Sequence, residues 1–257
     1  MKRKVTATVH EQNMIAKDIY EMWLTTDLAK EAKPGQFVNV YPKDKSTLLP
    51  RPISICEVDK ARNRMRIVYR LNGKGTREFS EYRAGDPVSV MGCLGNGYPM
   101  DELSKYRNIC LMGGGIGIPP MLQLAKELTC EKTLVMGYRN DDLSLNQDLW
   151  KDGTLYIATE DGSIGTKGNV LDAVREKAVT MDAICACGPM PMLRAIKQYA
   201  GEHHIPAYIS LEERMACGVG ACLGCVCKTT EVDPHSHVKN ARVCTNGPVF
   251  LADDVDI

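Results

Sequence analysis

Hydrophobic and polar positions alternate over short stretches in the first hundred residues. Four stretches share this pattern: residues 5–9, 36–40, 53–55 and 65–69. A period of two residues indicates strands with one buried face, and several short strands separated by turn residues indicate an antiparallel barrel or sandwich. We therefore predict an antiparallel β-barrel domain over residues 1–99.

The pattern changes its period after residue 100. Residues 108–112 form a continuous apolar run, a glycine-rich segment follows directly, and apolar residues then repeat at helical spacing. Strands and helices alternate beyond it: strands at 133–138, 155–159 and 183–187, and helices at 170–177 and 190–199. Such alternation predicts a parallel sheet with helices on both faces, an α/β domain over residues 100–210.

The remaining residues, 211–257, contain a cysteine-rich loop. Its spacing is Cys217-x4-Cys222-x2-Cys225, and Cys244 follows on a distant segment. This is the plant-type spacing of a [2Fe–2S] cluster, in which four thiolates hold two irons and the fourth comes from outside the loop. A structural zinc site and a disulfide knot are the alternatives, although zinc sites usually present two short cysteine pairs. The sequence predicts a small C-terminal cluster-binding domain, and with it an α+β multidomain protein.

Composition narrows the class of protein. The 257 residues carry 32 basic and 32 acidic side chains, which favours neither nucleic acid nor an anionic membrane as a partner. No apolar run approaches the ~18 residues of a membrane span, and no signal peptide is recognisable. Eleven cysteines, an odd number, suit reduced thiols better than a disulfide framework. We expect a cytoplasmic protein.

Two segments of the first domain carry candidate binding groups. Arg51-Pro52-Ile53-Ser54 places a guanidinium and a hydroxyl on one extended segment, which suits a phosphate or the edge of a flavin ring. Gly73-Lys74-Gly75-Thr76 offers backbone N–H groups and a hydroxyl, which suits a pyrophosphate. Each motif is weak alone, and Arg51 could equally be a surface arginine on a strand.

Three strand ends of the second domain carry further candidates. Gly114, Gly115 and Gly117 lie between a strand and a helix, the arrangement that directs helix N–H groups at a phosphate, although proline replaces the third glycine of the usual fingerprint. Asp161 ends another strand, where a carboxylate can accept from a ribose hydroxyl and repel a 2′-phosphate; a solvated turn is the alternative. Cys187-Gly188-Pro189 ends a third strand and opens a helix.

These blocks, in this order, resemble the ferredoxin–NADP reductase-like proteins. Arg51 to Ser54 resemble the flavin-contacting R-x-x-S/T motif, residues 73–76 the flavin-pyrophosphate turn, and residues 113–120 with 187–190 the two nicotinamide-nucleotide signatures. The added cysteine loop is similar to the electron-transfer subunits of class 1B dihydroorotate dehydrogenase, over essentially the whole chain. Ile53, where many relatives carry a stacking tyrosine, departs from the broader pattern.

The resemblance implies cofactors, a partner and residue roles. It implies bound FAD, a [2Fe–2S] cluster, NAD as the diffusible acceptor, and an FMN-containing dihydroorotate dehydrogenase catalytic subunit in a heterotetramer with two copies of each chain. It also implies flavin contacts from Val68, Tyr69 and Arg70, together with Gly75 and Thr76. We expect no substrate acid or base on this chain.

The motifs together also imply the order in which electrons pass between the cofactors, from cluster to FAD to nicotinamide or in reverse. Nicotinamide exchanges a hydride and a cluster exchanges single electrons, so the chain needs a carrier that does both, and flavin does. The first alternative is the FAD and [2Fe–2S] subunit of an NADH-dependent ferredoxin:NADP oxidoreductase or of a sulfide dehydrogenase. The second, from another class, is a non-catalytic redox sensor, against which the nicotinamide signatures argue.

Overall fold

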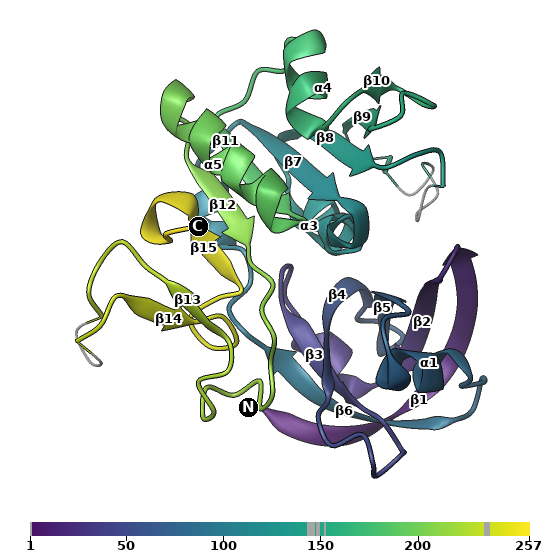
Figure 1. Ribbon diagram of the computed structural model, residues 1–257. Helices are drawn as coiled ribbons and strands as arrows, with labels where there is room; N and C mark the ends of the chain where they lie inside the picture. The colour runs from purple at the N-terminus through teal and green to yellow at the C-terminus, as the bar shows by residue number, and fades with distance from the viewer. Residues whose placement is uncertain (1, 143–146, 148–149, 152, 234–236) are drawn as a thin grey trace.

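The chain folds in three consecutive parts, a barrel, a sheet covered by helices and a smaller C-terminal part (Figure 1). The structure is a computed structural model that describes residues 2–142, 147, 150–151, 153–233 and 237–257. The C-terminal part contributes a strand to the sheet, and polar contacts join the barrel to both other parts, so the three are described together.

Six antiparallel strands close into the N-terminal barrel. They are β1 (Arg3–Ala16), β2 (Ile19–Thr25), β3 (Phe37–Tyr41), β4 (Arg51–Asp59), β5 (Arg64–Arg70) and β6 (Pro87–Leu94), in the spatial order β1-β2-β5-β4-β3-β6. Alternate side chains fill the interior, so that Val38 and Val40 of β3 belong to the barrel core whereas Phe37 packs outside it. The antiparallel barrel predicted from the sequence is confirmed, with β2 and β6 added to the four strands named there.

A seven-stranded sheet forms the centre of the second part of the chain. Its strands are β7 (Asn108–Gly114), β8 (Glu131–Tyr138), β9 (Thr154–Thr159), β10 (Thr166–Lys167), β11 (Ala183–Cys187), β12 (Ala207–Ser210) and β15 (Val249–Leu251), in the order β10-β9-β8-β7-β11-β12-β15. All neighbouring pairs are parallel except β12 with β15. The predicted parallel sheet is confirmed, and its carboxyl ends share one edge.

Helices cover both faces of this sheet. The helical segments of the chain are η1 (Asp27–Lys30), α1 (Lys74–Ser80), α2 (Met100–Leu103), η2 (Gly115–Gly117), α3 (Pro119–Glu127), α4 (Val170–Glu176), α5 (Met190–His203) and η4 (Ala252–Asp254). Helix α3 packs with Leu111 on one face, and α4 and α5 pack with Met112 on the other. Among the described residues, no helix is long and apolar enough to cross a membrane.

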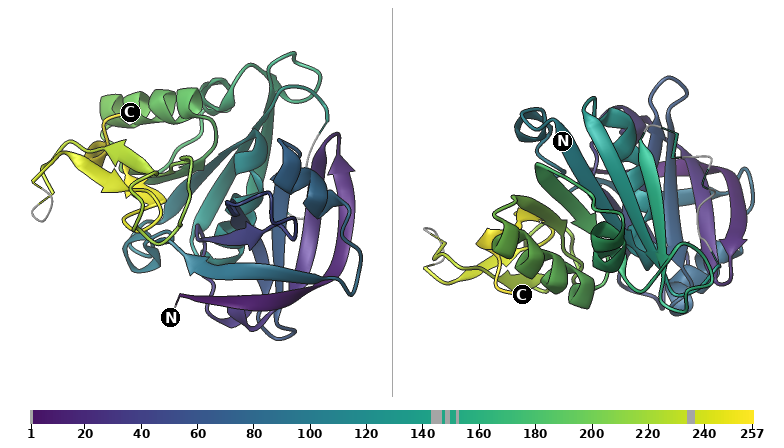
Figure 2. Two further views of the ribbon diagram at one scale, coloured as in Figure 1. Left: turned by 60° about the horizontal axis from the view of Figure 1, so that its bottom comes forward. Right: turned by 90° about the horizontal axis from the view of Figure 1, so that it is seen from above.

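The C-terminal part is interleaved with the sheet. Strands β13 (Val226–Lys228) and β14 (Asn240–Arg242) form a small hairpin, after which β15 pairs antiparallel with β12, Ser210 opposite Val249. Lys197 of α5 donates to the carbonyl of Val255, and Figure 2 shows the yellow C-terminal segment beside α5. A strand from residues 211–257 therefore completes the sheet of the preceding segment.

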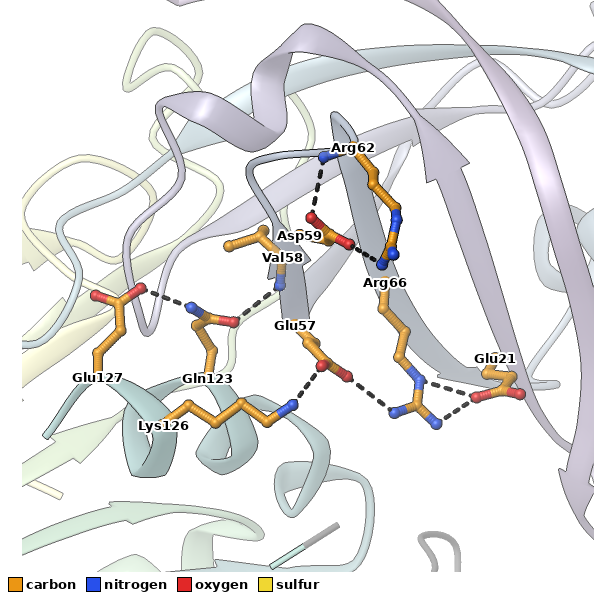
Figure 3. Close-up of polar contacts among 9 residues, drawn as sticks. All are labelled: Glu21, Glu57, Val58, Asp59, Arg62, Arg66, Gln123, Lys126 and Glu127. Carbon is orange, nitrogen blue, oxygen red and sulfur yellow. Dashed lines mark hydrogen bonds and ion pairs between the residues drawn. The ribbon is translucent and has the colours of Figure 1, made fainter. Parts of the chain in front are cut away.

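A polar network joins the barrel to α3. The backbone N–H of Val58 in β4 donates to Gln123 Oε1 of α3 at 2.8 Å, and Glu57 pairs with both Lys126 of α3 and Arg66 of β5. Figure 3 draws this network with its further members Glu21, Asp59, Arg62 and Glu127. Because α3 follows the glycine-rich turn and β4 begins at Arg51, the network binds together the two elements that carry these motifs.

Candidate functional site

The structure brings the two barrel motifs together. Arg51 begins β4 and its Nη1 donates to the carbonyl of Leu49 at 2.7 Å. A side chain at Gly75 would lie 2.9 Å from Arg51 Nε, so the guanidinium packs directly on the start of α1. Thr76 Oγ1 accepts from Asn72 N at 2.8 Å and fixes the preceding turn. Residues separated by a strand and a turn thus form one surface.

The remaining members of the barrel set lie along β4 and β5. Pro52, Ile53 and Ser54 are half-buried and pair with Asn39, Val38 and Phe37 of β3. Val68 and Tyr69 are buried, and the Tyr69 hydroxyl donates to Gln12 Oε1 at 2.9 Å inside the barrel. Arg70, the next residue, is exposed and lines the cavity described below. Of the three β5 residues, only Arg70 therefore directs its side chain to that cavity.

A cavity of about 550 Å³ opens at the carboxyl edge of the parallel sheet. Gly114, Gly115, Gly188 and Pro189 line it, as the sequence predicts for a nucleotide site. Gly117 is packed below, because a side chain there would lie 2.6 Å from Gly188 N. The two glycine-containing strand ends therefore meet, and their backbones form one wall.

Ile116 of the glycine-rich turn also lines the cavity, as do Pro191 and Met192, which follow the Cys187-Gly188-Pro189 segment. The lining residues that the sequence analysis did not assign to the site are Gly137, Tyr138, Arg139, Glu160, Gly168, Asn169, Val170, Leu171, Ala195 and Glu212. Arg139 and Glu160 directly follow β8 and β9, so the rule that ligands bind at the carboxyl ends of parallel strands could have found them.

Asp161 lies beside the cavity without lining it. Its Oδ1 accepts from Ser163 N at 3.0 Å and from Ser163 Oγ at 2.7 Å, and these hydrogen bonds hold the pKa of the carboxyl below its usual range. The carboxylate of this turn that reaches the cavity wall belongs to Glu160. Glu160 and Asp161 are the two central residues of a turn closed by the hydrogen bond from Gly162 N to Thr159 O at 3.1 Å, and the bonds to Ser163 hold the Asp161 side chain within that turn.

Cys187 and Glu212 lie close together beside this cavity. Burial raises the pKa of the Cys187 thiol, and the nearby Glu212 carboxyl adds to this effect. Glu212 itself lines the cavity, where partial desolvation raises the pKa of its carboxyl. The structure thus places two weakly acidic groups where the sheet meets the C-terminal part.

Four of the five cysteines of the C-terminal part associate in two pairs, Cys217 with Cys222 and Cys225 with Cys244. Cys217 Sγ accepts from Val219 N at 3.4 Å and Ala221 N at 3.3 Å. Partial burial acts to raise the pKa of Cys217, but these N–H groups and neighbouring Cys222 lower it to about 6. Gly218 and Gly220, with φ of +71° and +84°, allow the tight turn that aims these N–H groups at sulfur.

The second pair is more deeply placed. Cys225 Sγ accepts from Cys244 N at 3.4 Å, and burial together with neighbouring Cys225 raises the pKa of Cys244 to about 11. Cys222 Sγ of the first pair accepts from Gly224 N at 3.4 Å and is exposed. The arrangement therefore has one solvent-facing pair of thiols and one buried pair.

This donor set fits a two-iron cluster. A tetrahedral iron that shares two bridging sulfides takes two thiolates, so two irons require two pairs of thiols. In the part of the chain that the structure describes, no three His, Cys, Asp or Glu side chains are grouped as one metal ion requires. The N–H groups aimed at sulfur are the hydrogen bonds that stabilise anionic cluster ligands. Cys227, although buried nearby, belongs to neither pair.

Comparison with known proteins agrees with this geometry. Residues 212–256 match the family model of the iron-sulfur cluster binding domain of dihydroorotate dehydrogenase B. The chain is 42% identical to the dihydroorotate dehydrogenase B (NAD(+)) electron transfer subunit of Geobacillus sp. (strain WCH70), over 99% of each chain. It is also 42% identical to the subunit of that name from Fusobacterium nucleatum, over 97% of each chain.

Solved structures show the same architecture. The NADH-dependent reduced ferredoxin-NADP oxidoreductase aligns with a TM-score of 0.86 and 30% identity, over 97% of this chain and 89% of that one. The ferredoxin reductase of carbazole 1,9a-dioxygenase, 18% identical, shares the fold with a TM-score of 0.66 over 81% of this chain and 69% of its own. The chain belongs to the family of dihydroorotate dehydrogenase B (NAD(+)) electron transfer subunits.

Proposed function

We propose that this chain carries electrons from a dihydroorotate-oxidising catalytic subunit to NAD+ in pyrimidine biosynthesis, by way of a [2Fe–2S] cluster and FAD. The observation that carries the proposal is the pairing of Cys217 with Cys222 and of Cys225 with Cys244, on a chain that also has a nucleotide cavity. When bound, flavin exchanges single electrons with a cluster and a hydride with nicotinamide. The chain itself supplies binding, orientation and hydrogen bonds to sulfur.

The proposed cofactor contacts follow the two surfaces of the site. For FAD they are Arg51, Pro52, Ile53, Ser54, Val68, Tyr69, Arg70, Gly75 and Thr76, with Tyr69 acting through its backbone because its side chain lies inside the barrel. For NAD they are Gly114, Gly115, Gly188 and Pro189, which line the cavity, together with Gly117, Cys187 and Asp161, which support its wall from outside the lining. Arg70 lines the same cavity as these glycines, which supports adjacent flavin and nicotinamide sites.

We assign the preference for NAD over NADP to the turn that follows β9. Glu160 lines the cavity and would repel a 2′-phosphate, whereas Asp161 shapes the turn through Ser163. Glu160→Gln should therefore raise the rate with NADPH relative to NADH by about tenfold. Asp161→Asn, which keeps the turn-forming oxygen, is the matched control and should leave the ratio near that of the unaltered chain. An unchanged ratio in Glu160→Gln would exclude this assignment.

The partner is an FMN-containing catalytic subunit, with two copies of each chain in the complex. Cys222 is exposed, and the adjacent Leu223 is 64% exposed, so the outer thiol pair lies at an apolar surface that a partner can cover. None of the eleven cysteines, all of which lie in the described part of the chain, forms a disulfide, and such a pattern supports a reducing compartment such as the cytoplasm.

The decisive experiment is anaerobic co-expression of the chain with such a catalytic subunit. The complex should contain FAD, FMN and two irons per copy of this chain, and it should reduce NAD+ when dihydroorotate is added. Cys225→Ser should lose the cluster, whereas Cys227→Ser, the same substitution two residues away on β13, should retain it. A complex that holds zinc, or one whose cluster depends on Cys227 rather than Cys225, would contradict the proposal.

One observation favours a second function. The NADH-dependent reduced ferredoxin-NADP oxidoreductase aligns over nearly the whole chain at 30% identity. The corresponding alternative is a subunit that exchanges electrons with ferredoxin through a different flavoprotein. Purification from the native cell separates the two, because the partner would then reduce ferredoxin and leave dihydroorotate unoxidised.

A further inference from the structure

A single amide connects the barrel to the cluster loop. Asn39 lies on the outer side of β3 and is fully buried, and its Nδ2 donates to the carbonyl of Cys217 at 3.2 Å. In the barrel register Asn39 pairs with Pro52 of the proposed flavin motif. One residue therefore contacts the first cysteine of the outer thiol pair and also adjoins the strand that begins at Arg51.

The loop backbone lies directly against this amide. A side chain at Gly218 would collide with Asn39 Nδ2 and lie 3.2 Å from Leu94 Cδ1 of β6. Phe37 and Leu94, on the same outer surface of the barrel, share a core with Cys225 and Cys244. The segments that carry both thiol pairs thus pack against the outer surface of β3 and β6, and Asn39 supplies a polar contact there.

Burial of the Asn39 side-chain amide carries an energetic cost, because one of its polar atoms lacks a hydrogen-bond partner among the described residues. Asn39 Oδ1 is buried and has no hydrogen-bond partner among the residues that the structure describes. An unsatisfied buried acceptor costs about 1–3 kcal/mol. An apolar side chain of similar size would avoid this cost, but it would supply neither the donor to Cys217 nor the hydrogen bond between the Asn39 and Tyr41 side chains.

A second amide contacts the other cluster segment but is replaceable. Asn96 Nδ2 donates to the carbonyls of Thr245 and Asn246, at 3.1 and 3.0 Å, next to Cys244. Asn96 is exposed, so water can take over these hydrogen bonds when the side chain is removed. Water cannot readily do so at Asn39.

We propose that Asn39 is a positioning residue for electron transfer, which fixes the Cys217 segment of the cluster loop against the flavin-carrying strand of the barrel. This inference rests on the proposed function. The rate of electron exchange between two centres depends on their separation and orientation, so a loop that can shift relative to the barrel exchanges electrons more slowly. Loosening the loop should therefore slow cluster reduction and leave nicotinamide binding intact.

The test compares Asn39→Leu with Asn13→Leu in the complete complex. Asn13 is also an asparagine on a barrel strand, β1, but its amide is exposed and donates hydrogen bonds to Glu11 and Glu21. After anaerobic mixing with NADH, Asn39→Leu should reduce flavin at the unaltered rate and the cluster about tenfold more slowly. Asn13→Leu should change neither phase.

A second readout does not depend on the loaded enzyme. In cluster-free protein, hydrogen exchange at the amides of Val219 and Ala221, which donate to Cys217 Sγ, should be faster in Asn39→Leu than in Asn13→Leu. Unchanged exchange together with unchanged cluster reduction would overturn the inference, as would equal slowing of both reduction phases. If the unaltered complex fails to reduce flavin with NADH, the proposed function fails instead, and the exchange experiment still decides the role of Asn39.

Discussion

At the scale of one residue, the backbone at Gly117 packs closely against the backbone of Cys187 and Gly188, and this contact fixes one wall of the nucleotide site. A side chain there would meet the carbonyl of Cys187 and the N–H of Gly188, and neither backbone group can move aside alone. Gly117→Ala should therefore separate the two strand ends and lower the free energy of unfolding by about 1–3 kcal/mol. Urea denaturation, with NADH binding measured in parallel, checks both consequences.

Gly201 in α5 provides the matched control for this change. No atom lies within 4 Å of a side chain built at that position, and alanine is favoured over glycine inside a helix. Gly201→Ala should raise the free energy of unfolding by about 0.5–1 kcal/mol. If both alanine variants shift stability in the same direction, close packing at Gly117 does not explain its effect.

The contact between β4 and α3 determines how the barrel meets the nucleotide sheet at the scale of elements (Figure 3). Gln123 accepts the N–H of Val58, which lies in the part of β4 that β3 does not pair. Gln123→Leu would leave this donor without its acceptor, and we expect a loss of about 1–3 kcal/mol in the free energy of unfolding. Thermal or urea unfolding measures the loss.

Gln198→Leu tests the same substitution on an exposed helix surface. Gln198 of α5 donates only to Glu202, at 2.8 Å in solvent, so its replacement should change stability by less than about 0.5 kcal/mol. A Gln123→Leu variant as stable as Gln198→Leu would mean that the hydrogen bond to Val58 does not join the two parts.

At the scale of the whole molecule, the periodicity of apolar residues predicted the barrel and the parallel sheet, but not that a strand from the C-terminal part pairs with that sheet. The apolar runs that became β7, β8 and β11 are continuous, as strands buried on both faces require, and they were named correctly. Strand β15 has three residues, too few for a period, and its pairing with β12 is a contact between distant segments. Pattern alone carries no information on such a pairing.

The site was predictable to the extent that its residues occur in motifs. The cysteine spacing and the glycine-rich turns identified segments that the structure brings together, because loop geometry demands particular residues at fixed spacing. Glu160 was missed by one position, since both residues lie in the turn after β9 and the turn conformation decides which of them lines the cavity. Asn39 was missed because its partner Cys217 lies far away in the sequence.

The interleaving of β15 has a consequence for biosynthesis. During translation the barrel emerges from the ribosome first and can fold early, but β12 keeps an open edge until β15 has been synthesised. Cys244 lies between β14 and β15, so the fourth thiol arrives only shortly before that strand. The nascent chain therefore passes through a stage with an unpaired sheet edge at β12 and only three of the four cluster thiols, and the set of four thiols is complete only after Cys244 has been added.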